Sequence, residues 1–291
     1  MLLWVTPSGA EAPAFPEERT FLYPAISPDG KALAVTLEGA NQDIWRLEPG
    51  RPVLARLTSS PSEDFGAVWS PDGRRLAFTS VRFGKDPAVF VKPAERADGE
   101  ALVADSSFPN AWTPDGKELI VTTERFEGGR KVVALARASL DGGLLPGLET
   151  SRFDRYGAAR SPDGRHLAFV SQETGHAEVF VASPDASDAR QASVGGGTSP
   201  VWARDGRQLF YRNGDAVMSV AVGNGARPPL SPPRLLFRGQ FEEPARPDWP
   251  RNYDVAPDGR FLMIRQTYTP IIRELVVVLG WPGQTLRPST E

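Results

Sequence analysis

The sequence has no cysteine, only two histidines and no long apolar run. Without cysteine, disulfides, thiolate metal sites and a cysteine nucleophile are all excluded. The longest late apolar run, residues 275–279, falls far short of the ~20 residues that span a bilayer. Residues 1–6 are too short an apolar stretch, and lack the basic flank, for a secretory signal. The chain therefore contains no signal or transmembrane segment, and we expect no direct membrane insertion.

An excess of charge of one sign is also missing. Lys and Arg number 33 against 36 Asp and Glu, a formal net charge of −3, so binding to nucleic acid is disfavoured. Glycine and proline are abundant, at 28 each, while 40% of the residues are hydrophobic. This composition, together with the absence of useful helical periodicity, favours a turn-rich all-β fold with a packed interior.

One tetrapeptide, Ser-Pro-Asp-Gly or a close variant, occurs six times. Its glycines advance by 43, 43, 48, 42 and 53 residues, which matches the ~40–45 residues of a four-stranded propeller blade. Proline presets φ at the second turn position, and glycine supplies a positive φ at the exit. The same residue in the same turn six times indicates geometry, so we expect these to be structural turns with no metal and no cofactor. The turn pairs are Asp29 and Gly30, Asp72 and Gly73, Asp115 and Gly116, Asp163 and Gly164, Asp205 and Gly206, and Asp258 and Gly259.

The residues around each turn read as strands. A leucine lies three residues after every turn glycine and is followed by further apolar residues, which predicts a strand buried on both faces. Large apolar residues just before the turns, such as Trp69, Trp112 and Trp202, should pack between blades. Arg160 and Asp254 break the apolar series at their positions, so each is either a functional residue or a local packing adaptation.

These patterns predict one domain over residues 1–291, an all-β, six-bladed β-propeller of four-stranded antiparallel blades. The last blade lacks strands, and both termini should close it. We expect residues 274–281 to supply its third strand and residues 2–15 its outer strand. The predicted blades are residues 20–58, 65–104, 109–149, 156–193, 198–238, and 251–281 with 2–15.

The repeats resemble the TolB-like family of WD-type propeller repeats over nearly the whole chain, and most of all the carboxy-terminal extracytoplasmic propellers of bacterial serine/threonine kinases. The segments that carry the resemblance are Asn41–Trp45, Asp64–Phe65 with Val68–Ser70, Gly195–Trp202, Asn252–Val255 and Val276–Trp281. The resemblance implies a monomeric protein-binding or sensor module in a periplasmic or extracytoplasmic location, although the absence of a signal leaves a cytoplasmic one open.

Enzymatic functions find little support in the sequence. There is no glycine-rich phosphate loop with a strand lysine, and no Gly-x-Ser-x-Gly elbow with a partnered histidine. We therefore expect no catalytic residues and no enzyme. The alternatives are a carboxylate-based lyase or hydrolase, a propeller subunit of an enzyme, or a small-molecule or glycan sensor domain of a kinase-linked receptor.

The blades differ most in the loops opposite the repeated turns, where aromatic and charged residues gather. Aromatic rings beside arginine are typical of interface hot spots, and the alternative is that the rings cap the ends of blades. We expect a protein or peptide segment to bind at this loop-rich face. The candidate binding residues are Asp64, Phe65, Phe83, Phe108, Phe126, Phe153, Arg155, Tyr156 and Trp249.

Overall fold

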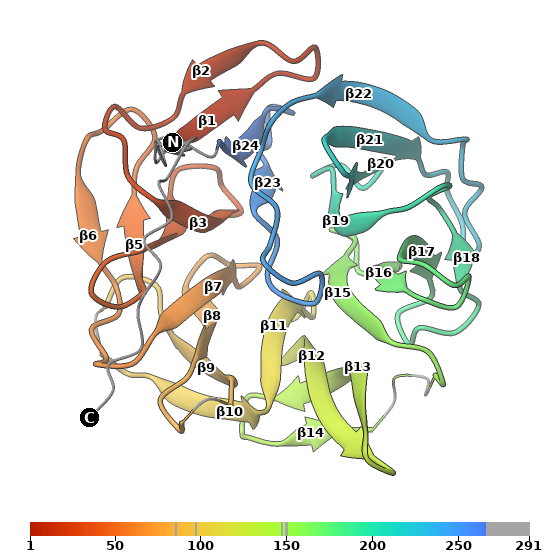
Figure 1. The fold of residues 1–291 in the computed structure, drawn as a ribbon, viewed down its shortest axis with the longest axis horizontal. Coiled ribbons are helices and arrows are strands. Elements are labelled where there is room, and N and C mark those ends of the chain that lie inside the picture. Colours follow the sequence, from red (N-terminus) through yellow and green to blue (C-terminus); the bar gives the residue numbers. More distant parts are fainter. Residues whose placement is uncertain (85, 97, 147, 149–150, 266–291) are drawn as a thin grey trace, which may run out of the picture.

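The computed structural model describes residues 1–265, apart from residues 85, 97, 147 and 149–150. Six four-stranded antiparallel sheets stand around a central channel (Figure 1). The described residues form no helix, so no helix among them could cross a membrane. The predicted all-β, six-bladed propeller is confirmed.

Each of the first three blades is built from four consecutive strands, running from the channel outward. Blade 1 comprises β3 (Phe21–Ile26), β4 (Leu33–Leu37), β5 (Asp43–Leu47) and β6 (Leu54–Arg56). Blade 2 comprises β7 (Asp64–Trp69), β8 (Arg75–Ser80), β9 (Ala88–Pro93) and β10 (Ala101–Asp105). Blade 3 comprises β11 (Ser107–Trp112), β12 (Glu118–Glu127), β13 (Arg130–Ser139) and β14 (Leu144–Leu145).

The next two blades follow the same order, and the last combines strands from both parts of the chain. Blade 4 comprises β15 (Arg155–Arg160), β16 (Leu167–Ser171), β17 (Glu178–Ala182) and β18 (Arg190–Gln191). Blade 5 comprises β19 (Thr198–Trp202), β20 (Gln208–Asn213), β21 (Ala216–Ala221) and β22 (Arg234–Arg238). Blade 6 comprises β23 (Tyr253–Val255), β24 (Phe261–Ile264), β1 (Leu2–Val5) and β2 (Glu11–Pro13).

Both parts of the chain close blade 6, as predicted, but not with the predicted strands. β1 pairs directly with β24, from Leu2 opposite Ile264 to Val5 opposite Phe261, and so takes the third position. All four residues of β1 are buried, because they pack between blades 5 and 6 or blades 6 and 1, while the exposed β2 is the outer strand. The third position of blade 6 is therefore taken by β1, and the strand predicted over residues 274–281 lies outside the described part of the chain.

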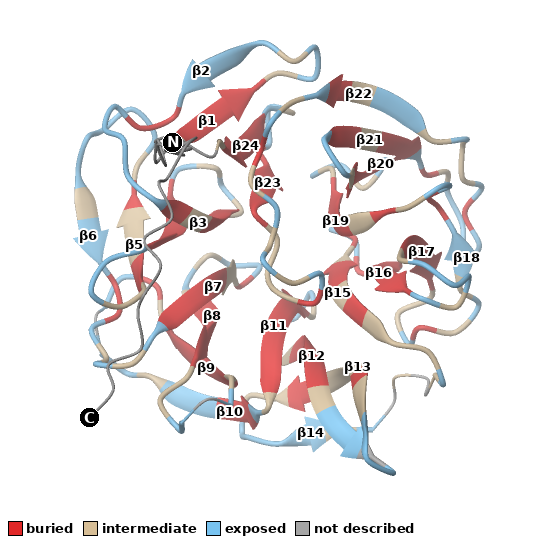
Figure 2. Ribbon diagram, in the orientation of Figure 1, coloured by how far each residue is buried: buried red, intermediate tan, exposed pale blue. Residues whose placement is uncertain are grey.

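The apolar core lies between neighbouring blades. Separate clusters fill these spaces; one of them joins Ile44 of blade 1 to Leu76 and Phe78 of blade 2. The strands after the turns of blades 1, 4 and 6 are buried on both faces, as predicted, since a neighbouring sheet covers each side. Figure 2 shows burial falling outward, from the buried inner strands to exposed strands such as β2 and β18.

The repeated turns form one face of the ring, which we call the turn face. The Ser27 hydroxyl donates a hydrogen bond to Asp29 Oδ1 (2.7 Å), which also accepts the Lys31 N–H (3.1 Å). The turns of blades 2, 3 and 4 repeat both bonds. In these four turns the hydroxyl hydrogen bond holds the pKa of the aspartate below its usual range. The carboxylates are thus occupied within their own turns.

The turns of neighbouring blades contact each other, because the proline of one turn packs against the glycine of the next. A Cβ atom added to Gly164 would lie 2.3 Å from Pro114 Cγ, in the turn of the preceding blade. Prolines of the preceding blade also face the glycines of four other turns, at 3.2 to 3.9 Å. The sequence of proline–glycine contacts is broken only after blade 5, where Arg204 replaces the proline and nothing lies within 4 Å of the Cβ position of Gly259.

Candidate functional site

A shared bulge shapes the inner strands along the channel. Between Phe65 and Val68 the pairing of β7 with β8 shifts register, and the inner strands of blades 1, 3, 4 and 5 shift at the equivalent place. Gly66 and Gly157 have positive φ in these bulges, as do Tyr23 and Ser199. The bulged residues therefore turn their backbone toward the channel and line its end nearest the interblade loops, the loop face.

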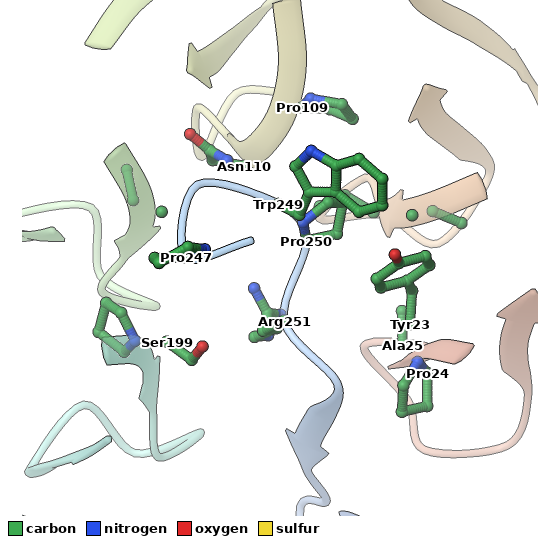
Figure 3. A pocket seen from close by; sticks show the side chains of 16 residues that line it. Tyr23, Pro24, Ala25, Pro109, Asn110, Ser199, Pro247, Trp249, Pro250 and Arg251 are labelled. Carbon is green, nitrogen blue, oxygen red and sulfur yellow. The ribbon is translucent and has the colours of Figure 1, made fainter. Parts of the chain in front are cut away.

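A segment of blade 6 closes the channel at this loop face. Residues 239–252, which we call the strap, connect β22 to β23 and cross the centre of the ring (Figure 1). Figure 3 shows Trp249, Pro250 and Arg251 of the strap lying between Tyr23 on one side and Ser199 on the other. A Cβ atom on Gly66 would lie 2.5 Å from Pro250 Cγ. Only about 30 Å³ remains open among these residues, room for no more than a water molecule or two.

Polar contacts fix the strap to blades 1 and 3. The Asn252 side-chain oxygen accepts the Tyr23 N–H at 2.9 Å. The Arg246 guanidinium donates to Glu124 at 2.8 Å and to Asp248 at 2.6 Å. The strap is therefore hydrogen-bonded to two different blades of the ring.

Glu124 and Asp248 form a pair of carboxyl groups near this closed end. Burial raises the pKa of Asp248, and the hydrogen bond that it shares with Glu124 adds to the rise, against the effect of Arg246. Lys131 bonds Glu124 from the other side at 2.6 Å. Both carboxyl groups thus have cationic partners, which accounts for the pair as an attachment of the strap.

The strap also buries part of the predicted aromatic set. Phe65, Phe108 and Tyr156 are all nearly inaccessible, and Trp249 packs on Phe65 with ring centroids 5.9 Å apart. Asp64 is fully buried beside Arg82, at 3.2 Å. Phe65 and Phe108 lie in one cluster with Trp249 of the strap, whereas Tyr156 is buried in the core between blades 4 and 5. None of the rings of Phe65, Phe108 and Tyr156 is accessible at the surface of this structure, and their role in binding stays a prediction.

The remaining predicted residues are accessible but do not surround the channel. Phe83 is 59% exposed, and Phe126, near the end of the long β12–β13 hairpin, is 78% exposed. Phe153 and Arg155 are half-buried and line a separate cavity of about 220 Å³ between blades 3 and 4. The structure therefore divides the predicted set into capping, hairpin and side-cavity residues.

At the turn face the channel opens into a cavity of about 400 Å³, which we call the funnel. Trp69, Trp112 and Trp202 form much of its wall. Each indole N–H donates to a carbonyl oxygen of the preceding blade, at 3.0 to 3.1 Å, which fixes the rings in place. Prolines of the turns, among them Pro28 and Pro114, line its rim. Rigid aromatic and proline surfaces of this kind suit a ligand with an apolar body.

The charged residues of the funnel are mostly arginines. Arg160, Arg204 and Arg251 line it together with one carboxylate, Asp254. Asp254 accepts the N–H groups of Ile26 and Val255 and lies 3.6 Å from Arg251. The sequence indicated Arg160 and Asp254 as breaks in the repeat, but it did not indicate that they share a cavity, and it missed Arg204.

Catalytic constellations are not found among the described residues. His166 is buried beside Trp202, and burial lowers its pKa. His176, Glu178 and Ser193 do meet, but Glu178 lies in the middle and accepts from both, so the histidine cannot activate the serine. Within residues 1–265 and outside their gaps, no three His, Cys, Asp or Glu side chains are grouped as metal ligands would be.

Comparison with known proteins finds similarity to TolB-like propellers over part of the chain. Residues 16–156 match the family described as the TolB beta propeller domain. A TolB homolog of Chlorobium luteolum is 40% identical over 60 residues, which are 21% of this chain and 13% of the relative's length. The resemblance predicted from the repeats is confirmed, whereas the particular likeness to kinase-linked propellers stays a prediction.

Solved structures share the fold at low sequence identity. A protein assigned as TolB from Agrobacterium tumefaciens superposes with a TM-score of 0.70 and 20% identity, over 90% of this chain and 96% of that one. An oligogalacturonate lyase from Vibrio parahaemolyticus has a TM-score of 0.51 and 11% identity, over 91% and 96% of the two chains. Because the second is an enzyme, the fold by itself does not decide between binding and catalysis.

Proposed function

We propose that this TolB-like β-propeller is a non-catalytic binding module that takes a protein or peptide segment into the funnel of its turn face. The observation that carries the proposal is the contrast between the two ends of the channel. The strap fills the loop end, whereas about 400 Å³ stays open at the turn end. We therefore propose the partner site at the turn face, opposite the loop-rich face that the sequence analysis favoured.

The funnel has the properties of a preformed recognition site. Its tryptophans are held by hydrogen bonds to neighbouring blades, so little side-chain entropy is lost when a ligand packs against them. Tryptophan and arginine are also the residues that most often dominate binding energy at interfaces. An extended segment with apolar side chains and at least one polar anchor fits these walls.

A second site for a partner is the outer part of the loop face. Phe83 and Phe126 are the residues of the predicted set that are strongly exposed there. A large exposed ring on a projecting hairpin is suited to a protein contact. We keep this surface as the second candidate, and the experiment below separates it from the funnel.

Selection from a random peptide library on the immobilised full chain, followed by calorimetry, tests the proposal. The Trp69→Leu variant changes a half-buried wall of the funnel, while the Phe83→Ser/Phe126→Ser double variant changes the loop face. We expect Trp69→Leu to weaken the selected peptides by about tenfold, since a lost aromatic anchor costs on the order of 1–2 kcal/mol. The double variant should bind as the wild type does.

Three results would count against this assignment. If no peptide is selected, the binding function is contradicted. If the double variant alone loses binding, the site is the loop face. If Glu124→Gln abolishes turnover of a substrate on a panel that includes acidic glycans, the protein is an enzyme that uses the Glu124–Asp248 pair.

The cellular setting is proposed on the family alone. Relationship to TolB supports a periplasmic or extracytoplasmic location, and a monomer that serves as a binding or sensor domain. Fractionation of native cells, followed by gel filtration of the protein from the fraction that contains it, tests both statements.

A further inference from the structure

We propose that the funnel contains an oxyanion site, formed by Arg160 and Arg204 with Arg251 behind them, that binds a carboxylate or phosphate group. The inference rests on the proposed function in one respect only, namely that the carboxylate or phosphate belongs to a bound peptide segment. The same guanidinium chemistry would also bind a small free anion.

The repeats provide an internal reference for both arginines. Immediately before the turn, three other blades have tryptophan and two have an aliphatic residue, whereas blade 4 has Arg160. At the second turn position, the five other blades have proline, whereas blade 5 has Arg204. Two breaks of the repeat, in adjacent blades, thus bring the same cationic group into one cavity.

Arg160 has no anionic partner among the described residues. Its guanidinium donates only to Gly164 O, in its own turn, at 3.0 Å, and its Nε atom is buried without a hydrogen-bond partner. Burial lowers its pKa and the charge of Arg137 lowers it further, while the more distant charges of Asp115 and Glu118 act in the opposite direction. A half-buried guanidinium that forms no ion pair is only partly compensated, and an oxyanion in the funnel would complete the compensation.

Arg204 stands where the other five turns have a proline, so the turn of blade 5 makes no proline contact with the turn glycine of blade 6. The space beside Gly259 is empty, and the Arg204 side chain reaches across blade 6 to donate to Ile26 O of blade 1 at 3.1 Å. A carbonyl oxygen carries no net charge, so this cation too remains without a carboxylate among the described residues. Its remaining N–H groups are available to a ligand.

The carboxylate that lines the funnel does not cancel these cations. Asp254 is occupied by two backbone N–H groups and by Arg251. The turn aspartates bond within their own turns and do not line the funnel. The funnel is therefore locally positive in a protein whose formal net charge is −3.

Calorimetry and tryptophan fluorescence at low ionic strength test the site on the full chain. The probes are inorganic phosphate, an end-blocked hexapeptide of alternating Asp and Glu, and the matching peptide of Asn and Gln. The variants are Arg160→Gln, Arg204→Gln and Arg204→Pro, the last of which restores the residue of the repeat. Arg207→Gln is the matched control, because it removes the same charge from an exposed position in the same blade outside the funnel.

We expect phosphate and the acidic peptide to bind the wild type, and each funnel variant to weaken both by about tenfold, since one charge-assisted hydrogen bond is lost. Arg207→Gln should change the affinity by less than about twofold, as a distant screened charge does. Thermal unfolding confirms that each variant is folded.

The possible results separate the two proposals. If phosphate binds with this dependence and the acidic peptide does not, the oxyanion site stands and the peptide carrier is contradicted. If both peptides bind equally and the funnel variants bind like the wild type, the oxyanion site is overturned while the binding module stands. If no probe binds, or if Arg207→Gln weakens binding as much as Arg160→Gln, the oxyanion site is overturned.

Discussion

At its loop face the channel is closed by the protein's own strap, whereas at its turn face it opens into the funnel. The loop face has the more varied residues, and much of that variety serves closure: Trp249 packs on Phe65, and Arg246 joins Glu124. The turn face has the more uniform residues, and its blades differ chiefly at Arg160 and Arg204, two arginines that break the repeat. In a repeat protein, therefore, a varied loop is not in itself a binding site, and a uniform face becomes specific where one copy departs from the others.

The largest effect is expected from opening the ring, because both ends of the channel depend on its closure. Deleting residues 1–15 removes β1 and β2 and the buried side chains of Leu2, Leu3, Trp4 and Val5. The loss of this apolar burial should cost on the order of 5 kcal/mol or more of unfolding free energy. Urea titration measures the cost, and Val53→Ala, at an exposed apolar residue, is the neutral control. Unchanged unfolding of the deletion variant would contradict closure by β1.

A smaller effect should distinguish the tight from the open part of the turn face. Gly164 and Gly259 have similar positive φ values, 72° and 83°, so alanine strains both backbones alike, by about 1 kcal/mol. Only at Gly164 does the added methyl group meet a neighbour, Pro114 at 2.3 Å. We expect Gly164→Ala to lose about 2 kcal/mol more than Gly259→Ala in urea titrations. Equal losses would mean that the turns are not in tight contact.

The loop end of the channel, where the strap packs against the blades, offers a second matched pair of glycines. Gly66 and Gly157 occupy equivalent bulges, with φ of 67° and 60°. A methyl group on Gly66 meets Pro250 at 2.5 Å, whereas one on Gly157 meets only Val170 at 3.8 Å. Gly66→Ala should be the more destabilising by about 1 kcal/mol or more, since the methyl group would force Pro250 and blade 2 apart. Equal stability of the two variants would show that the strap does not press on blade 2.

The smallest effect is the contribution of the turn aspartates to stability at low pH. In the turns of blades 1 to 4 the aspartate pKa values are lowered by folding, so their stabilisation is complete above the unfolded pKa of about 4 and is lost as the pH falls through the lowered values. These groups are largely exposed, so the four together should contribute less than about 1 kcal/mol.

Replacing these four aspartates by asparagine tests the effect. The melting temperature of the variant should fall less steeply below pH 4 than that of the wild type, and its affinity for phosphate should not change. A changed phosphate affinity would show that the turn aspartates influence the funnel. The four positions are Asp29, Asp72, Asp115 and Asp163.

The fold could be predicted because its signals are local and repeated. Turn chemistry and strand patterning recur in every blade, and even the sharing of the last blade followed from counting strands. Which strand took which place did not follow, because β1 and residues 274–281 are both short and apolar. The place of β1 depends on its pairing with β24, far away in the sequence.

The candidate site was harder to predict because it depends on contacts without a sequence period. Nothing in the composition of the strap indicates that Pro250 lies against Gly66 or that Trp249 covers Phe65. Arg160 was visible as an exception to the repeat. Arg204 was missed, although it stands in the turn of blade 5 where the other turns have proline, and its reach to Ile26, 178 residues away, has no signal in the sequence.

The pairing of β1 with β24 also determines the order in which the protein can assemble during synthesis. Leu2 is made before the five other blades, but its partner Ile264 leaves the ribosome only after those blades have been translated. Until then β1 is an apolar strand with an unpaired edge, which is the kind of segment that associates with other nascent chains. Ring closure joins strands that are separated in the sequence by five whole blades, and contacts over such a separation form late and slowly. A chaperone that holds apolar strands would therefore act first on residues 1–5, before any other part of the ring needs it.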